Sequence, residues 1–343
     1  MTFGISNRGN PDLVSIAIFR TRVKVPAAGS RFSAHSGGWS RMILVNRIVA
    51  SLMALPISLT GATVGYAGAD ACSRCHRAEF NMQSASSHAR ALARSSDTQP
   101  GEWAFGAGDQ AITFVSRIDA GHYREEGRSW YRQINGLGPT PGAATPGGTT
   151  YRIFDPSGAI LNCFSCHSTG PLALAADESL APHELGVRCE ACHGPAAAHA
   201  RSPAAEHPQN PGRLTAERLN DFCGSCHRMP LRGSETLDVR DAWNVRHQPP
   251  SLAASACFRE SRGKLSCLTC HSPHAQIERN PAAYDATCRK CHAAPKHNVA
   301  VGARTCTGCH MPRVRPTPYL SFSNHRIAIY SASDPLLPIR AAR

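Results

Sequence analysis

Seven copies of the pattern Cys-x-x-Cys-His dominate the sequence. They take up fourteen of the 15 cysteines and seven of the 17 histidines in the 343-residue chain. If histidine followed each cysteine pair only at its overall frequency, seven matches in seven would have odds on the order of one in a billion. In chain order, motifs 1 to 7 are Cys72/Cys75/His76, Cys163/Cys166/His167, Cys189/Cys192/His193, Cys223/Cys226/His227, Cys267/Cys270/His271, Cys288/Cys291/His292 and Cys306/Cys309/His310.

The spacing within each motif matches the chemistry of c-type haem attachment. Two cysteines three residues apart lie on one helical turn and can form thioethers with the two vinyl groups of one haem, and the next histidine can ligate its iron. Zinc ribbons are the alternative, since cysteine pairs also hold zinc, but zinc does not require histidine after every second cysteine. The motifs therefore predict seven covalently attached c-type haems, each with the motif histidine as its proximal ligand.

Residues 1–67 are predicted to be a leader with a signal peptide over about 42–67. A basic start at Arg41 precedes an apolar run over 48–59 and the small residues Gly65 and Ala67, a pattern typical of a secretory signal cut after Ala67. Haem attachment to such motifs takes place outside the bacterial cytoplasm, so a periplasmic or otherwise exported protein is expected. An uncleaved membrane anchor is the alternative, although the apolar run contains Pro56 and is short for a span.

The formal net charge of +13 does not indicate nucleic-acid binding. Seven basic residues and one acidic residue lie in the leader, which leaves +7 on residues 68–343. Seven ferric haems, each with two propionates and one positive core charge, would add about −7. The oxidised mature protein is therefore expected to be close to neutral, and no basic run with interleaved aromatics is present.

The motifs divide the chain unevenly, because motif 1 starts 91 residues before motif 2 and the other six follow closely. A helix is predicted over 77–95, strands over 111–118, 122–133 and 149–155, and a loop over 136–148. The expected divisions are a leader over 1–67, a haem 1 segment and helix over 68–105, a β-rich insertion over 106–160, a six-haem array over 161–325 and a tail over 326–343.

Aromatic residues make up only 6% of the chain, so porphyrins are expected to supply much of the buried apolar surface. The predicted fold class is mainly α with extensive irregular loops, packed around seven haems, with a small β subdomain between haem 1 and haem 2. The array is expected to consist of short helices joined by Pro/Gly-rich loops.

Nine histidines outside the motifs are candidate sixth ligands: His88, His122, His183, His199, His207, His247, His274, His297 and His325. Ligation of every iron by two histidines is thus possible but not forced. His274 follows His271 by three residues and His199 follows His193 by six, too close to reach the opposite face of the same porphyrin. Such a histidine must serve the haem of another motif, or else be a surface or propionate-bonding residue.

Several stretches resemble multihaem cytochromes c related to the tetrahaem electron acceptor of hydroxylamine oxidoreductase, the cytochrome c554/c-prime type. They are CSRCHRAEFNMQSASSHARAL, CFSCHSTG, GVRCEACHGPAAAHA, LSCLTCHSPHAQ and CTGCHMP with NHRI downstream. The similarity covers most of residues 70–330. It implies that His88, His199, His274 and His325 are distal iron ligands, with His297 a weaker match.

Two functions follow from these motifs. The first is electron transfer along closely packed, mostly bis-histidine haems between other redox proteins, such as cytochromes, quinol-linked components or terminal reductases and oxidases. The second is an oxidoreductase in which one haem keeps an open position for a small nitrogen or sulfur oxyanion species. All seven motifs end in histidine, unlike the lysine-containing motif of pentahaem nitrite reductases, which favours electron transfer. No catalytic residue is assigned.

Cys257 is the cysteine that belongs to no motif. Without a second such cysteine it cannot form a disulfide within the chain. A thiol packed against a haem is the plain interpretation, and an axial thiolate or reactive thiol is the alternative.

Overall fold

The computed structural model describes residues 65–141, 152–154, 159–295, 297 and 304–339. These residues fall within one unit, Leu59–Arg343. Most of the predicted leader, part of the predicted loop over 136–148 and part of the predicted strand over 149–155 lie outside the described residues.

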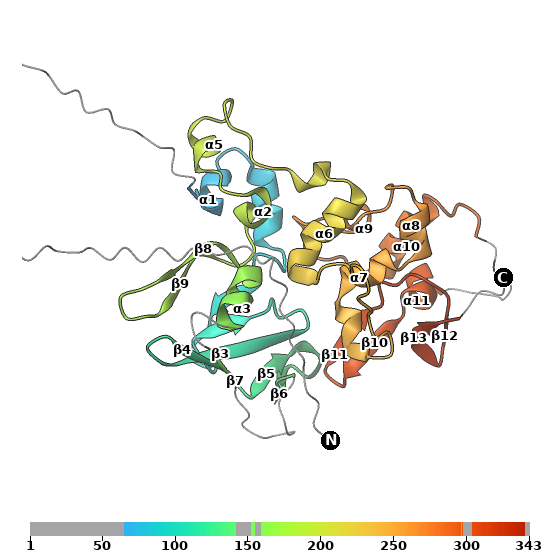
Figure 1. Cartoon of the computed structure of the whole chain (residues 1–343), viewed down its shortest axis with the longest axis horizontal. Helices are drawn as coiled ribbons and strands as arrows, with labels where there is room; N and C mark the ends of the chain where they lie inside the picture. Colours follow the sequence, from blue (N-terminus) through green and yellow to red (C-terminus); the bar gives the residue numbers. More distant parts are fainter. Residues whose placement is uncertain (1–64, 142–151, 155–158, 296, 298–303, 340–343) are drawn as a thin grey trace, which may run out of the picture. The chain divides into compact units, whose positions relative to one another are not determined.

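The strands of the described residues form four sheets, where the sequence predicts one β-rich region. The largest sheet has the order β1-β2-β3-β4-β7, with β5 pairing β3 and β6 (Figure 1). Its strands are β1 (Leu92–Arg94), β2 (Trp103–Phe105), β3 (Ala111–Asp119), β4 (His122–Glu125), β5 (Arg128–Tyr131), β6 (Gly136–Pro139) and β7 (Arg152–Phe154). The other three sheets are the antiparallel pairs β8 (Ser168–Leu174) with β9 (Leu180–Leu185), β10 (Arg313–Thr317) with β11 (Leu320–Ser323), and β12 (Tyr330–Ser331) with β13 (Asp334–Pro338).

The helices are short, and most of them carry or adjoin a motif. They are α1 (Ala69–Cys72), α2 (Arg77–Ser84), α3 (Ala159–His167), α4 (Cys189–His193), α5 (Ala197–Arg201), α6 (Ala216–His227), α7 (Gln248–Ala253), α8 (Ala256–Glu260), α9 (Cys267–Cys270), α10 (Pro281–Arg289) and α11 (Cys306–His310). Single 3₁₀ turns are η1 (Arg132–Ile134), η2 (Pro211–Arg213) and η3 (Ala242–Arg246). No helix among the described residues combines the length and the apolar character needed to cross a bilayer.

The predicted helix over 77–95 is too long. Helix α2 ends at Ser84, and the chain then turns so that the Ser86 hydroxyl accepts a hydrogen bond from the Ala89 amide. Leu92 follows as a buried residue of β1, opposite Phe105 of β2. The local helix propensity of this segment is overridden, because pairing with β2 buries Leu92.

The strand predicted over 122–133 is also wrong as one element. It is divided into β4 and β5, which pair with different parts of β3 on either side of Gly127. The predicted strand over 111–118 coincides with β3, whereas the start of the predicted loop forms β6. The β-rich insertion is predicted to start after residue 105, but the sheet already begins at Leu92. This is because β1 and β2 pair with each other and β2 pairs with β3.

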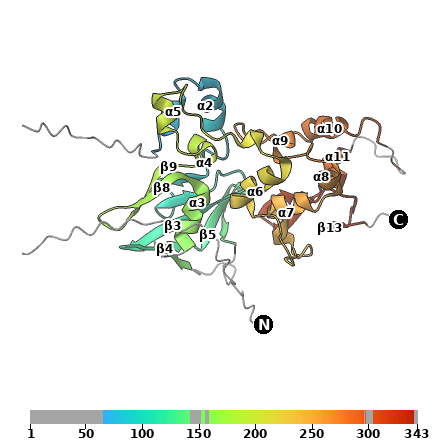
Figure 2. The same ribbon diagram turned by 45° about the horizontal axis from the view of Figure 1, so that its top comes forward.

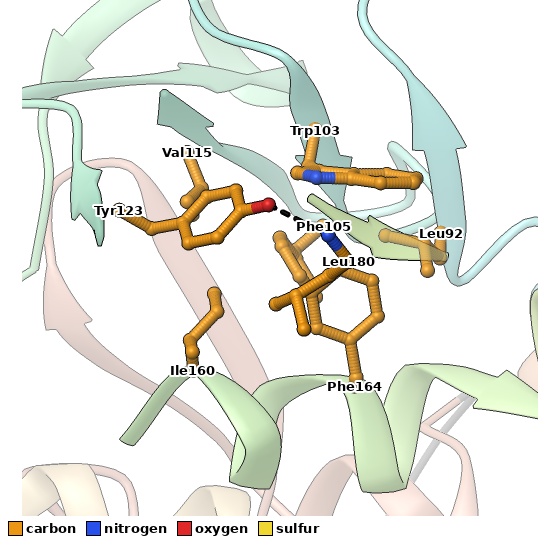
Figure 3. Packing of buried hydrophobic residues seen from close by; sticks show 8 residues of the cluster. All are labelled: Leu92, Trp103, Phe105, Val115, Tyr123, Ile160, Phe164 and Leu180. Carbon is orange, nitrogen blue, oxygen red and sulfur yellow. Dashed lines mark hydrogen bonds between the residues drawn. The ribbon is translucent and has the colours of Figure 1, made fainter. Parts of the chain in front are cut away.

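The main hydrophobic core lies between this sheet and α3. Ile160 and Phe164 rise from α3 toward Trp103 and Tyr123 of the sheet, as Figure 3 shows. The Phe164 ring meets the Trp103 ring edge-on at 5.1 Å between centroids. The Tyr123 hydroxyl accepts a hydrogen bond of 2.9 Å from the Leu180 amide, which attaches the β8–β9 hairpin to the core.

Motif 2 is anchored to this core, which is made of side chains. Its first cysteine, Cys163, is partly buried and packs against the cluster from α3. The neighbouring Phe164 belongs to the cluster itself. The position of motif 2 is therefore set by packing of the chain.

Helices α6 to α11 lie beyond this core in the chain and are separated by loops (Figure 2). Helix α6 buries Leu219 and Asn220, and the Asn220 amide donates to the Pro249 carbonyl of α7 at 3.1 Å. Helices α9, α10 and α11 carry residues of motifs 5, 6 and 7, respectively. None of these helices contains a buried residue. Side-chain packing thus contributes little to the position of these three motifs.

Candidate haem-binding sites

Each motif lies at a helix end or forms a helical turn of its own. Motifs 2 and 4 end the longer helices α3 and α6, whereas motifs 3 and 7 coincide with the one-turn helices α4 and α11. The Thr305 side chain accepts from the Gly308 amide and caps α11 at its start. The chain therefore presents two sulfurs and an imidazole from one short segment, as covalent haem attachment requires.

Motifs 1 and 6 differ from the predicted helical geometry. Their second cysteines, Cys75 and Cys291, lie outside a helix, because α1 ends at Cys72 and α10 ends at Arg289. Each amide instead donates to the carbonyl of the first cysteine of its motif at 3.2 Å, which closes a single tight turn. The expectation that both cysteines lie on one turn of α-helix is therefore wrong for these two motifs, although the turn keeps the two residues close.

Several motif histidines have one ring nitrogen against a backbone carbonyl. The Nδ1 atoms of His167, His193 and His310 lie 2.8, 2.8 and 2.9 Å from the carbonyl oxygens of Ala91, Gln209 and Ala328. Because a carbonyl oxygen only accepts, Nδ1 must carry the proton, which leaves the lone pair on Nε2. That tautomer is the one that binds iron through Nε2.

Five motif histidines each face a histidine that belongs to no motif. The pairs, with their ring-centroid distances, are His76 with His199 at 6.3 Å, His227 with His88 at 6.2 Å, His193 with His274 at 6.1 Å, His271 with His325 at 6.2 Å and His310 with His297 at 6.5 Å. Two imidazoles on opposite sides of one metal, each with a metal–nitrogen bond of about 2.0 Å, have centroids separated by about 6.3 Å. The five spacings therefore fit one iron between each pair.

Four of the five paired histidines come from segments remote from the motif that they face, whereas His297 lies just before motif 7 in the chain. His199 lies on α5, after motif 3, and faces motif 1; His88 follows motif 1 and faces motif 4. His274 follows motif 5 and faces motif 3. This arrangement accords with the expectation that a histidine close behind one motif serves another haem, and ligation itself stays a prediction.

Two of the facing histidines are oriented by a backbone carbonyl. His199 Nδ1 lies 2.7 Å from the Glu206 carbonyl oxygen, and His325 Nδ1 lies 3.0 Å from the Ser323 carbonyl oxygen. Nδ1 therefore carries the proton in both, as it does in the three motif histidines described above. Burial lowers the pKa of His325 to about 4, with the charges of His271 and His227 acting in the same direction. A neutral imidazole is the form that binds a metal.

The segment that carries His88 is positioned by Gly186. The Val187 amide donates to the His88 carbonyl at 2.8 Å, and a Cβ on Gly186 would lie 2.0 Å from the Ala89 carbonyl oxygen. Gly186 also has a φ of +78°. Only glycine tolerates both this backbone conformation and this approach, so the residue fixes the position of His88.

Motif 3 is fastened to the start of the described chain by Glu190. Its carboxylate accepts from the amides of Ala67, Gly68 and Ala196 at 2.9, 2.8 and 2.7 Å. Sequence reasoning missed this role, because Glu190 occupies one of the two variable positions of motif 3. No local pattern marks a carboxylate two of whose three partners lie more than 120 residues away.

Four candidate ligands have other surroundings. His122 Nδ1 lies 2.5 Å from an Asp119 carboxylate oxygen at an exposed position, and the His183 ring contacts Tyr66. The His207 ring faces the non-motif His199 rather than a motif histidine. His247 has a buried Nδ1 without a hydrogen-bond partner, and burial lowers its pKa to about 4. None of the four rings is paired with a motif histidine among the described residues.

Some motif sulfurs lie close to sulfurs of other motifs. Hydrogen-bond contacts join Cys72 to Cys189, Cys166 to Cys226, Cys223 to Cys267 and Cys288 to Cys306. These contacts link motif 1 to 3, motif 2 to 4, motif 4 to 5 and motif 6 to 7. If each of these sulfurs carried a haem, the contacts would place the attachment points of different haems close together.

The second cysteines of motifs 1, 6 and 7 do not take part in these contacts. Cys75 and Cys291 are exposed and Cys309 is half-buried. Within the described ranges, no hydrogen-bond contact joins the sulfur of any of the three to a sulfur of another motif. Haem attachment stays a prediction from the motif spacing for all fourteen motif cysteines.

Cys257 lies on α8, half-buried, and burial raises the pKa of its thiol. The thiol is therefore protonated near neutral pH, which fits a packed side chain better than a thiolate. Within the described ranges no group of three or more histidine, cysteine or acidic side chains is arranged to hold a metal ion, as a zinc site would require.

Known proteins were compared with this chain. Residues 154–194, which hold motifs 2 and 3, match the family described as cytochrome c554 and c-prime. A segment of 133 residues is 28% identical to the multiheme cytochrome MtrA of Shewanella baltica (strain OS185), covering 35% of this chain and 33% of that protein. The predicted resemblance to multihaem cytochromes c is confirmed.

The fold is similar to that of a solved cytochrome. The outer cell wall cytochrome OcwA matches with a TM-score of 0.51 and 17% identity, over 76% of this chain and 79% of that one. The MtrA match spans about a third of that cytochrome's length, so the similarity is local in sequence and extends further in structure. Both the matched relative and the solved neighbour are described as cytochromes.

Proposed function

We propose that this chain is an exported, periplasmic heptahaem c-type cytochrome that carries electrons along mostly bis-histidine haems between redox partners. The observation that carries the proposal is the set of five facing histidine pairs, each at the spacing expected across one iron. An iron with two histidine ligands has no open position for a small molecule and is suited to electron transfer.

The protein's own groups serve this function by holding ligands in place. Backbone carbonyls keep the proton on Nδ1 of His193 and His199, which leaves the Nε2 lone pair to bind a metal. Haem, once attached, supplies the one-electron chemistry. Burial at His325 lowers its pKa and so favours the neutral imidazole that binds a metal.

The sulfur contacts support an order of transfer. Motif 4 contacts both motif 2 and motif 5 through Cys226 and Cys223, which makes haem 4 a branch point. Cys192 of motif 3 also lies near Cys226, and Cys270 of motif 5 near Cys288. Every haem would then have at least one neighbour, and the six haems other than haem 2 would form one continuous line.

Export and partners belong to the same proposal. The predicted signal peptide supports an extracytoplasmic location, and the name of the solved neighbour places that cytochrome at the outer cell wall. The partners would be other redox proteins, since irons ligated by two histidines are suited to exchanging electrons.

A second candidate is a multihaem oxidoreductase, favoured by motifs 2 and 6. His167 contacts the Phe105 ring, and neither His167 nor His292 faces another histidine ring within the described residues. A haem ligated by only one of these histidines would have an open position for a small nitrogen or sulfur oxyanion.

Rapid mixing separates the two functions. Intact-protein mass first gives the haem count, for which seven is expected. The fully reduced protein is then mixed with a ferric small cytochrome or with nitrite, hydroxylamine or sulfite. Electron transfer predicts reoxidation by the cytochrome and no reaction with the small molecules. Fast reoxidation by one of the small molecules would establish the oxidoreductase instead, and fewer than seven haems would refute the heptahaem prediction.

A further inference from the structure

Four arginines converge on a cleft outside the haem motifs. The cleft has a volume of about 420 Å³ and is lined by Asp109, Arg132, Arg279, Arg313, Arg315 and Ser321, among others. They come from three parts of the chain: the residues just before β3 together with η1, the loop that follows motif 5, and the β10–β11 hairpin. The fold therefore brings charged side chains that are far apart in the sequence to one cleft.

The hairpin side of the cleft is fixed by hydrogen bonds. Arg313 donates to the Ser321 carbonyl at 2.7 Å and to the Ser321 hydroxyl at 3.1 Å, across β10 and β11. Gln110 donates to the same carbonyl at 2.9 Å and attaches the hairpin to the start of β3. The guanidinium of Arg313 is therefore held in place.

The opposite side is organised by one carboxylate. Asp109 accepts from Arg279 and lies 3.5 Å from Arg132, and it also accepts from Ser87 and Gln276. The Arg132 and Arg279 side chains stay about half exposed, at 55% and 49%. Both can therefore bind a second anion while contacting Asp109.

Positive charge in the cleft is not balanced. One carboxylate faces four guanidinium groups, and the Arg315 side chain makes no hydrogen bond or ion pair within the described residues. Burial and the charges of Arg279 and Arg315 lower the pKa of Arg313. Repulsion among these groups is a cost that a bound anion would relieve.

We propose that this cleft binds a dianion of the phosphate or paired-carboxylate type. Guanidinium groups bind such oxygens in bidentate fashion, and the two sides of the cleft can contact opposite ends of one ligand. The dianion has two possible sources with the same chemistry: a free inorganic anion, or the two propionates of a haem attached to this chain.

The test uses the haem-loaded protein and inorganic phosphate as the probe. The variants are Arg315→Gln and the double variant Arg279→Gln/Arg315→Gln. The control is Arg213→Gln, which removes the same charge from an exposed residue of η2. Calorimetry measures phosphate binding at low ionic strength, and a redox titration of each protein measures haem midpoint potentials.

If the site takes a free anion, one phosphate binds the wild type and the control equally, and Arg315→Gln weakens binding about tenfold. If propionates occupy the site, phosphate does not bind, but both variants lower the midpoint potential of one haem relative to the control, because less positive charge faces its propionates. Phosphate binding that is equal in all four proteins, or absence of both effects, would overturn the proposal. None of these outcomes depends on whether the haems transfer electrons or reduce a substrate.

Discussion

The sheet region (residues 92–185) and the motif array (residues 189–310) are stabilised in different ways. In the sheet region Trp103, Tyr123 and Phe164 are at most 1% exposed and pack into one core. In the array, helices α9 to α11 bury no residue, and Leu268 and Ile277 are 37% and 50% exposed. What the array has instead is facing histidine rings and neighbouring sulfurs.

This difference indicates which region depends on its cofactor. A core of side chains gains its hydrophobic free energy from the chain alone. An array whose side chains are arranged around ligand positions gains it when haem is attached, as in other proteins whose metal binding is coupled to folding. Experiments can therefore test whether the two regions depend on haem to different extents.

Expression without haem attachment has the largest expected effect. Amides of α9 to α11 should exchange with solvent on the order of 100-fold faster than in the haem-loaded protein, whereas amides of β2 and β3 keep protection. Hydrogen exchange followed by mass spectrometry measures both regions in one sample. Equal loss of protection in the two regions would show that the sheet also needs haem.

Phe164→Ala should destabilise the sheet region by about 3–5 kcal/mol, because it removes a ring packed against Trp103 and Phe105. The matched control is Ile118→Ala on β3, where the side chain is 44% exposed and its loss costs little. Chemical denaturation monitored by tryptophan fluorescence measures the change. Equal effects of the two substitutions would contradict a core centred on α3.

Gly186→Ala tests how the sheet region positions a ligand of the array. A Cβ there meets the Ala89 carbonyl oxygen, so the backbone next to His88 must move, beyond the cost of about 1–2 kcal/mol for an alanine at positive φ. Gly263→Ala is the control, since Gly263 has a φ of +80° and nothing within 4 Å of its Cβ position. Only Gly186→Ala should change the visible spectrum of one haem.

The sequence could predict a large part of the site and less of the fold. All seven motifs are local patterns, and the candidate distal histidines include the five that face motif histidines. Which histidine faces which motif was beyond sequence reasoning, because His88 and His227 are brought together by the fold. Strands β1 and β2 were missed for the same reason, since Leu92 is buried only by pairing with β2.

His274→Ala should convert one haem from low-spin to high-spin while the fold is kept. The substitution removes the imidazole that faces His193 at 6.1 Å. His122→Ala removes an exposed imidazole that contacts Asp119 and should leave the spectrum unchanged. Magnetic circular dichroism of the oxidised variants measures the number of haems that change spin state, and an unchanged spectrum in His274→Ala would rule out this ligand.

Asp109→Asn should have the smallest effect, confined to acid pH. Burial raises the pKa of Asp109, but hydrogen bonds from Ser87 and Gln276 and the charge of Arg279 outweigh it, so the pKa is lowered overall. The ionised group therefore stabilises the fold above its ordinary pKa of 3.8, and this stability is lost as the pH falls below that value. Thermal midpoints between about pH 6 and pH 3 should fall less steeply in Asp109→Asn than in wild type or in the exposed control Asp97→Asn.

Quantitative electron paramagnetic resonance of the oxidised, haem-loaded protein counts the irons that are ligated by two histidines. If each of the five facing pairs holds one iron, at least five haems per chain are low-spin with two histidine ligands. Fewer than five such haems, with the remainder high-spin, would show that the facing rings do not ligate iron.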